Sequence, residues 1–189
     1  MANKVVFGLE NVHVCTYTVS GGTVTLGTPM HVPGAVNMSL EPDSEENSFY
    51  ADNVKYYTSY SDNGFTGELE MAMFSDTCKT TFLNYTALTG GGLAQVKGVQ
   101  NKDVCIIFEA KGDAEKRRCI LYNVALGNIN REFSTTTEST EPQTATLSFT
   151  VNGDNGTGIV KAEYPETASA YDTIFTTPPV PALPSASTN

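Results

Sequence analysis

The stretch from residue 49 to residue 74, FYADNVKYYTSYSDNGFTGELEMAMF, holds the clearest alternation of apolar and polar residues in the chain. In its second half the apolar positions are Phe65, Leu69, Met71 and Met73, and the polar positions are Thr66, Glu68 and Glu70. Successive side chains of a strand point to opposite faces, so this period of two predicts a strand with one face in a core. The other face is expected to lie in water.

The first half of the same stretch is expected to be the partner strand of a hairpin. Residues 54–60 place Val54, Tyr56, Thr58 and Tyr60 on one face, and SDNG at 61–64 is a turn sequence because Asn and Gly tolerate positive φ. Before it, residues 34–42 alternate as another half-buried strand that Pro42 helps to stop. Residues 43–48, DSEENS, are then expected to form an acidic loop.

Strand patterns dominate the rest of the chain, with one helical segment among them. Asp76 is expected to cap a helix over residues 77–88, whose apolar face carries Cys78, Phe82 and Tyr85. A strand that is apolar on both faces, as a central strand would be, is expected at 104–110. Further strands are expected at 11–19, 119–127, 144–151 and 159–165.

These elements predict a mainly β fold, with two packed antiparallel sheets in a sandwich or barrel, flanked by one α-helix. A length of 189 residues suits a single domain. We expect the domain to span residues 1–175, with residues 1–10 as an N-terminal arm. The sequence TTPPVPALPSASTN predicts a Pro-rich flexible tail over residues 176–189.

The charge balance limits the partners of this chain. There are 21 acidic and 11 basic residues, a formal charge of −10, which repels phosphates and argues against sequence-independent binding of DNA or RNA. No apolar run has the length of a signal peptide or a membrane span. We therefore expect a protein made in a cytoplasm, with no membrane partner.

The cysteines and histidines show no ligand spacing. Cys105 and Cys119 are expected on neighbouring strands, where a disulfide is conceivable, but nothing marks the chain as secreted and reduced thiols are favoured. His13 lies in a strand pattern and His31 in a loop, and neither has a second histidine at metal-ligand spacing. Ordinary surface or strand histidines are favoured over a fold-assembled metal or catalytic pair.

The acidic residues suggest calcium binding or glycosidase chemistry, each of which is weighed against ordinary solvent-exposed carboxylates. Residues 41–46 lack the alternating spacing of a calcium loop, and GDNGTG at 153–158 suits a tight turn as well as it suits calcium. The pair Glu68 and Glu70 on one strand face is reminiscent of a glycosidase, but no tryptophan accompanies it. We predict no enzyme, no catalytic residue, no metal and no cofactor.

Several segments taken together resemble a known family. NVHV, PGAVNMSLEP, FYADN, NGFTGELEMA and RRCILYNV occur in this order, between about Val6 and Val151. In order and spacing they resemble the major tail proteins of long-tailed bacteriophages, in particular the phi13-type family. The most specific part is YADN at 50–53, followed by NGFTGELE at 63–70.

The resemblance implies a tail tube subunit that forms hexameric rings, which stack into the conduit for DNA ejection. Its implied partners are copies of itself, tail-tip initiator, ruler and terminator proteins, and DNA that passes without binding. The implied location is the virion tail, after synthesis in the host cytoplasm. Some relatives carry an additional immunoglobulin-like domain, whereas here a proline-rich segment follows Tyr171.

The tube hypothesis assigns roles to particular side chains. Glu68 and Glu70 are candidate lumen-facing acids, with bulk solvent or the tube exterior as the alternative. Contacts between rings or subunits are expected from residues 1–10, 41–48 and 133–143, with ordinary surface loops as the alternative. The candidate contact residues are Glu41, Asp43, Glu45, Glu46, Phe133 and Glu138.

Three other functions stay open at this point. One is a β-sandwich binding or adhesion module, which would need a binding aromatic patch. Another is a hydrolase with a fold-assembled acidic site, which substitution of Glu68 and Glu70 by glutamine would reveal. The last is the tube of a phage-derived particle that carries no DNA.

Overall fold

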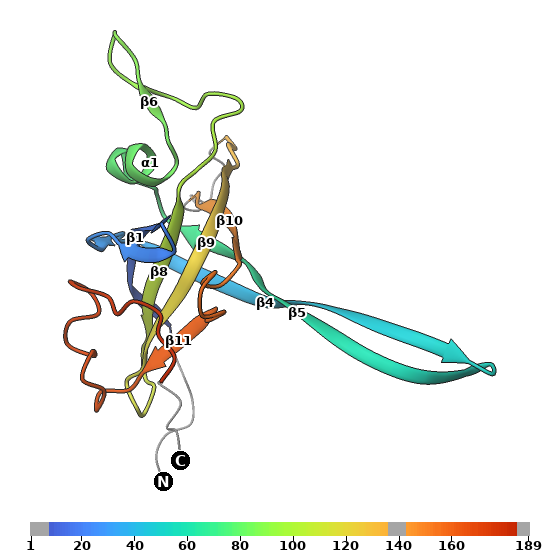
Figure 1. Ribbon diagram of the computed structural model, residues 1–189. Coiled ribbons are helices and arrows are strands. Elements are labelled where there is room, and N and C mark those ends of the chain that lie inside the picture. The colour runs from blue at the N-terminus through green and yellow to red at the C-terminus, as the bar shows by residue number, and fades with distance from the viewer. Residues whose placement is uncertain (1–7, 136–142, 185–189) are drawn as a thin grey trace.

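A computed structural model gives the structure of the protein and describes residues 8–135 and 143–184 (Figure 1). Strands account for most of this part of the chain, so the predicted mainly β fold with one helix is confirmed. The helix of the described part, α1 (Asp76–Phe82), is too short to cross a membrane. The strands are β1 (Leu9–Ser20), β2 (Thr23–Leu26), β3 (Met30–His31), β4 (Ala35–Ala51), β5 (Val54–Met71), β6 (Thr86–Ala87), β7 (Leu93–Ala94), β8 (Asp103–Ala110), β9 (Arg118–Arg131), β10 (Ala145–Val151) and β11 (Lys161–Tyr164).

The strands form two antiparallel sheets of very different size. Nine strands make the large sheet, in the order β2-β1-β8-β9-β10-β5-β4, with β11 paired to β9 and β3 paired to β1. The strands β6 and β7 form a separate small sheet. The large sheet curls, because β1 near one of its ends also contacts β4 at the other. The curl encloses a core between the two halves of the sheet.

The central strand β8 shows how both faces of the sheet are covered. Its residues Val104 to Phe108 are all buried, as the doubly apolar pattern predicted. Val104, Ile106 and Phe108 join the first core cluster, inside the curl, with Leu69, Met71, Leu147, Phe149 and the helix residues Cys78 and Phe82. Cys105 and Ile107 point the other way, into a second cluster with Tyr17, Ile120, Tyr122 and Ile174.

The C-terminal segment covers this second cluster. Ile174 is fully buried in it, and Pro178 and Pro181 are buried further along. The Tyr122 hydroxyl donates a hydrogen bond of 2.9 Å to the carbonyl oxygen of Pro179. These contacts place residues 174–181 against apolar surface of the sheet, while the flexibility expected for the Pro-rich segment 176–189 stays a prediction. Residues 185–189 lie outside the described part.

The helix is shorter than predicted and its cap is different. The Ser75 side chain accepts a hydrogen bond of 3.2 Å from the backbone N–H of Cys78, so Ser75 is the N-cap, one residue earlier than expected. The helix ends at Phe82, whereas the sequence predicted that it would continue to residue 88. Asn84 has φ 49°, a left-handed conformation that turns the chain away from the helix axis.

The hairpin of β4 and β5 is longer than predicted, and its turn lies elsewhere. The two strands pair along 17 and 18 residues, and they reverse at Asp52 and Asn53, which have φ 51° and 62°. Two positive φ values match a type I′ turn, the form that suits the twist of paired strands. The predicted turn at 61–64 and the predicted acidic loop at 43–48 are therefore wrong, since both segments lie inside strands.

Three residues explain or extend this correction. Gly64 has φ 97° and its added Cβ would lie 2.1 Å from the Val151 carbonyl oxygen, so glycine serves a close strand approach there. Pro42 does not stop β4, because an edge strand tolerates the missing N–H and the register shifts at this point. Met73 does not share the core face of Leu69, since β5 ends at Met71 and Met73 is exposed.

The predicted contact segments are only partly described. Leu9 and Glu10, expected in an N-terminal arm, belong to β1 and pair with Ala110 and Glu109 of β8. Residues 1–7 and 136–142 lie outside the described part. The candidate Glu138 falls in the second of these gaps, so its role stays a prediction.

Candidate functional site

The polar face of the hairpin base joins neighbouring strands in one acidic surface. In the antiparallel register, Ser39 of β4, Glu68 of β5 and Ser148 of β10 lie side by side. The next row places Glu41, Thr66 and Thr150 together, and another row places Asn37, Glu70 and Thr146 together. We call these nine residues the acidic face. Lysine and arginine are absent from all three rows.

The acidic face is hollowed into a shallow groove. The groove has a volume of about 630 Å³ and runs over β4, β5, β10 and β9, with Glu41, Glu68 and Ser148 among its lining residues. Glu70 lies in the adjacent row, where its carboxylate accepts a hydrogen bond of 2.6 Å from the Thr144 hydroxyl. Glu68 and Glu70 are thus brought together with Glu41, which the sequence had assigned to a contact loop.

The outer half of the hairpin is a second candidate surface. In Figure 1 it projects from the body of the molecule as a two-stranded ribbon, and we call residues 43–62 the arm. No arm residue is buried. Its aromatic side chains are 61–77% exposed in each case, which is unusual for so many large rings on one short ribbon. They are Phe49, Tyr50, Tyr56, Tyr57 and Tyr60.

The arm is strongly acidic, with one internal charge cluster. The Glu46 carboxylate accepts hydrogen bonds from Lys55, from the Ser48 hydroxyl at 2.7 Å and from the Tyr60 hydroxyl at 3.4 Å. The hydrogen bonds from Lys55 and Ser48 and the charge of Lys55 lower the pKa of Glu46. Asp43 and Glu45 lie on the same strand as Glu46, so three of the predicted contact acids belong to the arm.

A third surface gathers basic and apolar residues around the loop before β8. The end surface, as we name it, comprises residues 96–102 with Arg131 and Phe133. Within the described part, Lys97, Lys102 and Arg131 are the basic residues that form no ion pair with a described acid. Val96, Val99 and Phe133 are 46%, 50% and 83% exposed, and Arg131 lies 5.6 Å from the centre of the Phe133 ring.

The end surface is held on the sheet and is not a free loop. The Asn101 side chain donates hydrogen bonds of 3.1 and 2.6 Å to the carbonyl oxygens of Leu126 and Gly127 in β9. Just before this loop, the Gln95 side-chain amide donates a hydrogen bond of 2.7 Å to the Asn128 side chain of β9. Phe133, a predicted contact residue, follows the end of β9, the strand to which this loop is hydrogen-bonded. No pattern in the amino-acid sequence pointed to residues 96–102 as a candidate surface.

The turn at 153–158 is closed by its own aspartate. The Asp154 carboxylate accepts hydrogen bonds from the Tyr17 hydroxyl at 2.7 Å, from the backbone amides of Gly156 and Thr157 at 3.1 and 2.6 Å, and from the Thr157 hydroxyl at 2.7 Å. Burial opposes ionisation, but these hydrogen bonds prevail and lower the pKa of Asp154. With its oxygens used internally, this carboxylate serves the turn and is a poor calcium ligand.

The fold brings the two histidines together. His13 of β1 pairs with His31 of β3, and the centre of the His13 ring lies 4.8 Å from that of His31 and 4.4 Å from that of Phe175. Burial is the main cause that lowers the pKa of His13. Within the described part, no group of three His, Cys, Asp or Glu side chains is placed to hold a metal ion.

The cysteines in the described part are all free thiols. Cys105 lies opposite Cys15 on β1 rather than opposite Cys119, which pairs with Phe108. Cys105 and Cys119 do lie on neighbouring strands, β8 and β9, but the register does not place them opposite each other, and the considered disulfide is not formed. Burial raises the pKa of the Cys78 and Cys119 thiols to about 11, so neither is a reactive thiolate at neutral pH.

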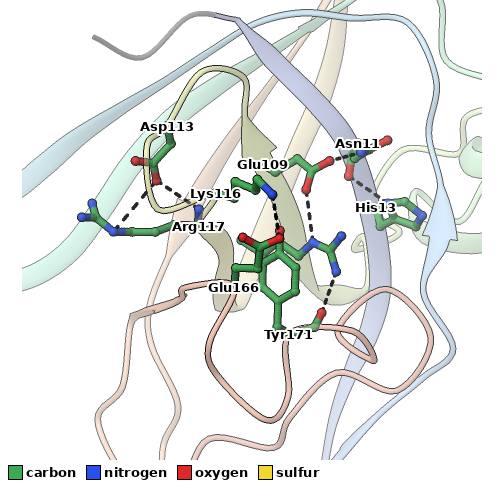
Figure 2. Close-up of polar contacts among 9 residues, drawn as sticks. Asn11, His13, Glu109, Asp113, Lys116, Arg117, Glu166 and Tyr171 are labelled. Atoms are coloured by element: carbon green, nitrogen blue, oxygen red, sulfur yellow. Dashed lines mark hydrogen bonds and ion pairs between the residues drawn. The ribbon is translucent and has the colours of Figure 1, made fainter. Parts of the chain in front are cut away.

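The densest polar cluster fastens the C-terminal segment to the sheet (Figure 2). Arg118 of β9 donates to the Glu109 carboxylate at 3.1 Å and to the Tyr171 carbonyl oxygen at 2.6 Å, while its guanidinium lies 3.9 Å from the centre of the Tyr171 ring. Lys116 pairs with Glu166 at 2.6 Å. These ion pairs and hydrogen bonds join the end of β8 and the start of β9 to the C-terminal segment, so the cluster acts as a structural clamp.

Comparisons with known proteins find a likeness in structure. No family model and no curated protein matches the sequence. The fold is similar to a chain of the anti-feeding prophage cap, the AFP tube-terminating cap, with a TM-score of 0.51 and 10% identity over 87% of this chain and 95% of that one. It is also similar to a chain of an extended sheath–tube complex from an extracellular contractile injection system, PVC, with a TM-score of 0.50 and the same identity and coverage. The likeness shows a shared fold over nearly the whole of each chain.

Proposed function

We propose that this protein is a structural subunit of a phage tail tube that assembles into stacked hexameric rings and forms the conduit for DNA ejection. The observation that carries the proposal is the shared fold, because it extends over 87% of this chain and 95% of chains from tube-containing injection systems. The resemblance of the sequence to major tail proteins of long-tailed phages is a separate reason for the choice of a DNA-carrying tail.

The acidic face is the proposed lining of the tube. Glu68, Glu70 and Glu41 lie there among hydroxyl and amide side chains, in rows without a basic residue. A basic wall would hold DNA along its length, whereas carboxylates repel its phosphates. Six copies at −10 each carry a formal charge of −60 per ring, and the repulsion acts within a Debye length of about 8 Å. Such a surface lets DNA pass without binding.

The edges of the large sheet are the proposed contacts within a ring. β4 ends the strand order and, within the described part, pairs on one side only, with β5. An unpaired edge is a template for a strand of another chain, and a head-to-tail contact of this kind closes into a ring under rotation. The helix α1 and the C-terminal segment cover other parts of the sheet and leave this edge open (Figure 1).

Contacts between rings are assigned to the projecting parts. Asp43, Glu45 and Glu46 of the arm, Phe133 beside β9, and Glu138 in the segment between the described parts are the proposed contact residues. The remaining partners follow from the proposed role: a tail-tip initiator that starts the tube, a ruler protein, and a terminator. The protein is then made in the host cytoplasm and ends in the virion tail, with no membrane partner.

Electron microscopy tests the proposal directly. Purified protein at increasing concentrations, alone and mixed with tail-tip complexes, is examined by negative stain beside light scattering. Rings or hollow tubes with sixfold end views are the expected result. A protein that stays monomeric at every concentration, and that also fails to extend tubes from tail-tip complexes, contradicts the proposed function.

A tube of a phage-derived particle is the second candidate, favoured by one observation. The two solved structures reported above come from contractile injection systems rather than from long-tailed phages. Particles purified from the native host distinguish the two functions. DNA protected inside the particles supports a phage tail, whereas tubes without a DNA-filled head support an injection particle.

A further inference from the structure

We propose that the arm of one copy docks on the end surface of a neighbouring copy, with the arm acids facing Lys97 and Lys102 and the arm aromatics covering Val96, Val99 and Phe133. The inference deepens the proposed function and rests on it, because it names the receiving surface of the contact between copies. The arm and the end surface are separate surfaces of one chain, and the proposal pairs the arm of one copy with the end surface of another.

The arm has the composition of an interface that is exposed in the single chain. Residues 43–62 contain five acidic residues and one lysine, a formal charge of −4. Within the described part, Glu45 and Asp62 form no ion pair, whereas Glu46 is already paired with Lys55. Tyrosine is enriched among the residues that contribute most to protein interfaces, because its ring buries a large area at a low cost in conformational entropy.

The end surface is complementary in charge and in character. Its cations Lys97 and Lys102 have no described acidic partner, although acidic residues outnumber basic ones almost two to one in the chain. Exposed Val96 and Val99 alternate with these charges along the loop. Because Asn101 and Gln95 fasten the loop to β9, the surface is ordered before docking, and a partner does not have to order it on binding.

The geometry requires a second copy. In Figure 1 the arm extends away from the body, while the loop before β8 lies at a different end of the molecule, so an arm does not reach its own end surface. The ribbon beyond the core is long enough to bridge to a neighbour: eight residues of an extended strand span about 26 Å. Contacts between two different surfaces of identical chains repeat from copy to copy and build an extended assembly.

Charge reversal with rescue tests the contact. The arm variant carries Glu45→Lys and Asp62→Lys, and the loop variant carries Lys97→Glu and Lys102→Glu. The fourfold variant carries all four changes, and the natural protein is the reference. Each double variant is expected to assemble at least tenfold more slowly at low salt, because like charges then face each other. The fourfold variant is expected to recover most of the rate. A control, Lys111→Glu with Lys161→Glu, makes the same charge change elsewhere and is expected to assemble like the natural protein.

Photochemical cross-linking provides a readout that does not require tubes. The full chain with a photoreactive benzoylphenylalanine in place of Tyr57 is mixed with isotope-labelled natural chain at high concentration and irradiated. Cross-links from Tyr57 to residues 95–102 or 131–133 of the labelled chain are expected. Cross-links to any other surface, or the lack of an inter-chain cross-link, overturn the docking proposal.

The two experiments separate this inference from the proposed function. If tubes form and the arm variant assembles at the natural rate, the docking proposal is wrong and the tube function stands. If the cross-links appear as expected but no rings or tubes form under any condition, the docking stands as a contact between copies and the tube function is wrong.

Discussion

The two halves of the hairpin β4–β5 form one continuous ladder, but the base packs on the core and the arm is surrounded by solvent. Near the body, Leu69 and Met71 of β5 are buried in the first core cluster, and the opposite face carries Glu68 and Glu70. In the arm the same strands continue, and their side chains point alternately to two faces, but neither face packs on a core. The base is thus fixed by burial, whereas the arm is held by backbone pairing and its turn.

This difference separates residues that stabilise the fold from residues that are available for contacts with other chains. An isolated two-stranded ribbon is at best marginally stable in water, because no apolar surface is removed from solvent. The arm nevertheless carries five large aromatic rings that contribute nothing to the internal core. Changes in the base should therefore be costly for folding, while changes in the arm should leave folding intact.

The largest expected effect belongs to Gly67, at the base of the hairpin. An added Cβ would lie 2.3 Å from the Ser39 carbonyl oxygen and 2.6 Å from the Phe149 ring, and neither neighbour is free to move. Gly67→Val is expected to cost more than about 4 kcal/mol or to prevent folding. Urea unfolding followed by circular dichroism measures this. Gly90→Val is the matched control, because no atom lies within 4 Å of its added Cβ; an equal loss in both variants contradicts the steric argument.

The next effect belongs to Asp154, whose buried carboxylate joins β1 to the turn after β10. Asp154→Ala leaves the Tyr17 hydroxyl and two backbone amides without their acceptor, so a loss of about 3 kcal/mol is expected in urea unfolding. Asp172→Ala, at an exposed position, serves as the control and is expected to change stability by less than about 0.5 kcal/mol. A loss below 1 kcal/mol for Asp154→Ala would mean that water replaces the carboxylate.

The same pair predicts how stability depends on pH. Burial, followed by the hydrogen bond to Asp154, raises the pKa of Tyr17 to about 12. Between about pH 10 and 12 the unfolded chain loses this proton first, so the contribution of Tyr17 to stability is lost as pH rises through that window. The lowered pKa of Asp154 adds stability that is lost as pH falls below its ordinary value near 3.8. Tyr17→Phe should flatten the alkaline decline in urea midpoints, and an unchanged decline contradicts the assignment.

The smallest effect on folding is expected in the arm. Phe49→Ser with Tyr57→Ser removes two rings that lie directly opposite each other on the ribbon, and neither ring touches the core. The free energy of unfolding is expected to change by less than about 0.5 kcal/mol. Assembly measured by light scattering should fall sharply in the same protein. A large loss of stability would show that the arm folds back on the body.

Much of the fold follows from apolar patterns in the sequence. The doubly apolar run at Val104 to Phe108 is a central strand, and Cys78 and Phe82 mark the helix face, because burial leaves a period that can be read locally. The acidic face was also foreseen in part, since Glu68 and Glu70 oppose a clean core face. Glu41 was missed there, because its row is created by the pairing of distant strands.

The errors arise where a local signal has two physical explanations. Asn-Gly at 63–64 is a strong turn signal, yet Gly64 is needed because the Val151 carbonyl oxygen leaves no room for a Cβ. Asp52 and Asn53 supply the positive φ values instead. The end surface could not be predicted, because Lys97 and Lys102 stand out only once the structure shows that most other described basic residues form ion pairs and these two do not.

The placement of tyrosine in the arm gives the protein a built-in optical reporter. The chain has nine tyrosines and no tryptophan, so its intrinsic emission comes from tyrosine alone. Tyr50, Tyr56, Tyr57 and Tyr60 lie exposed on the arm, whereas Tyr17 and Tyr122 are buried in the body. Quenching by a small neutral agent such as acrylamide therefore samples mainly the arm, and its decline as chains associate would time the burial of the arm without any label.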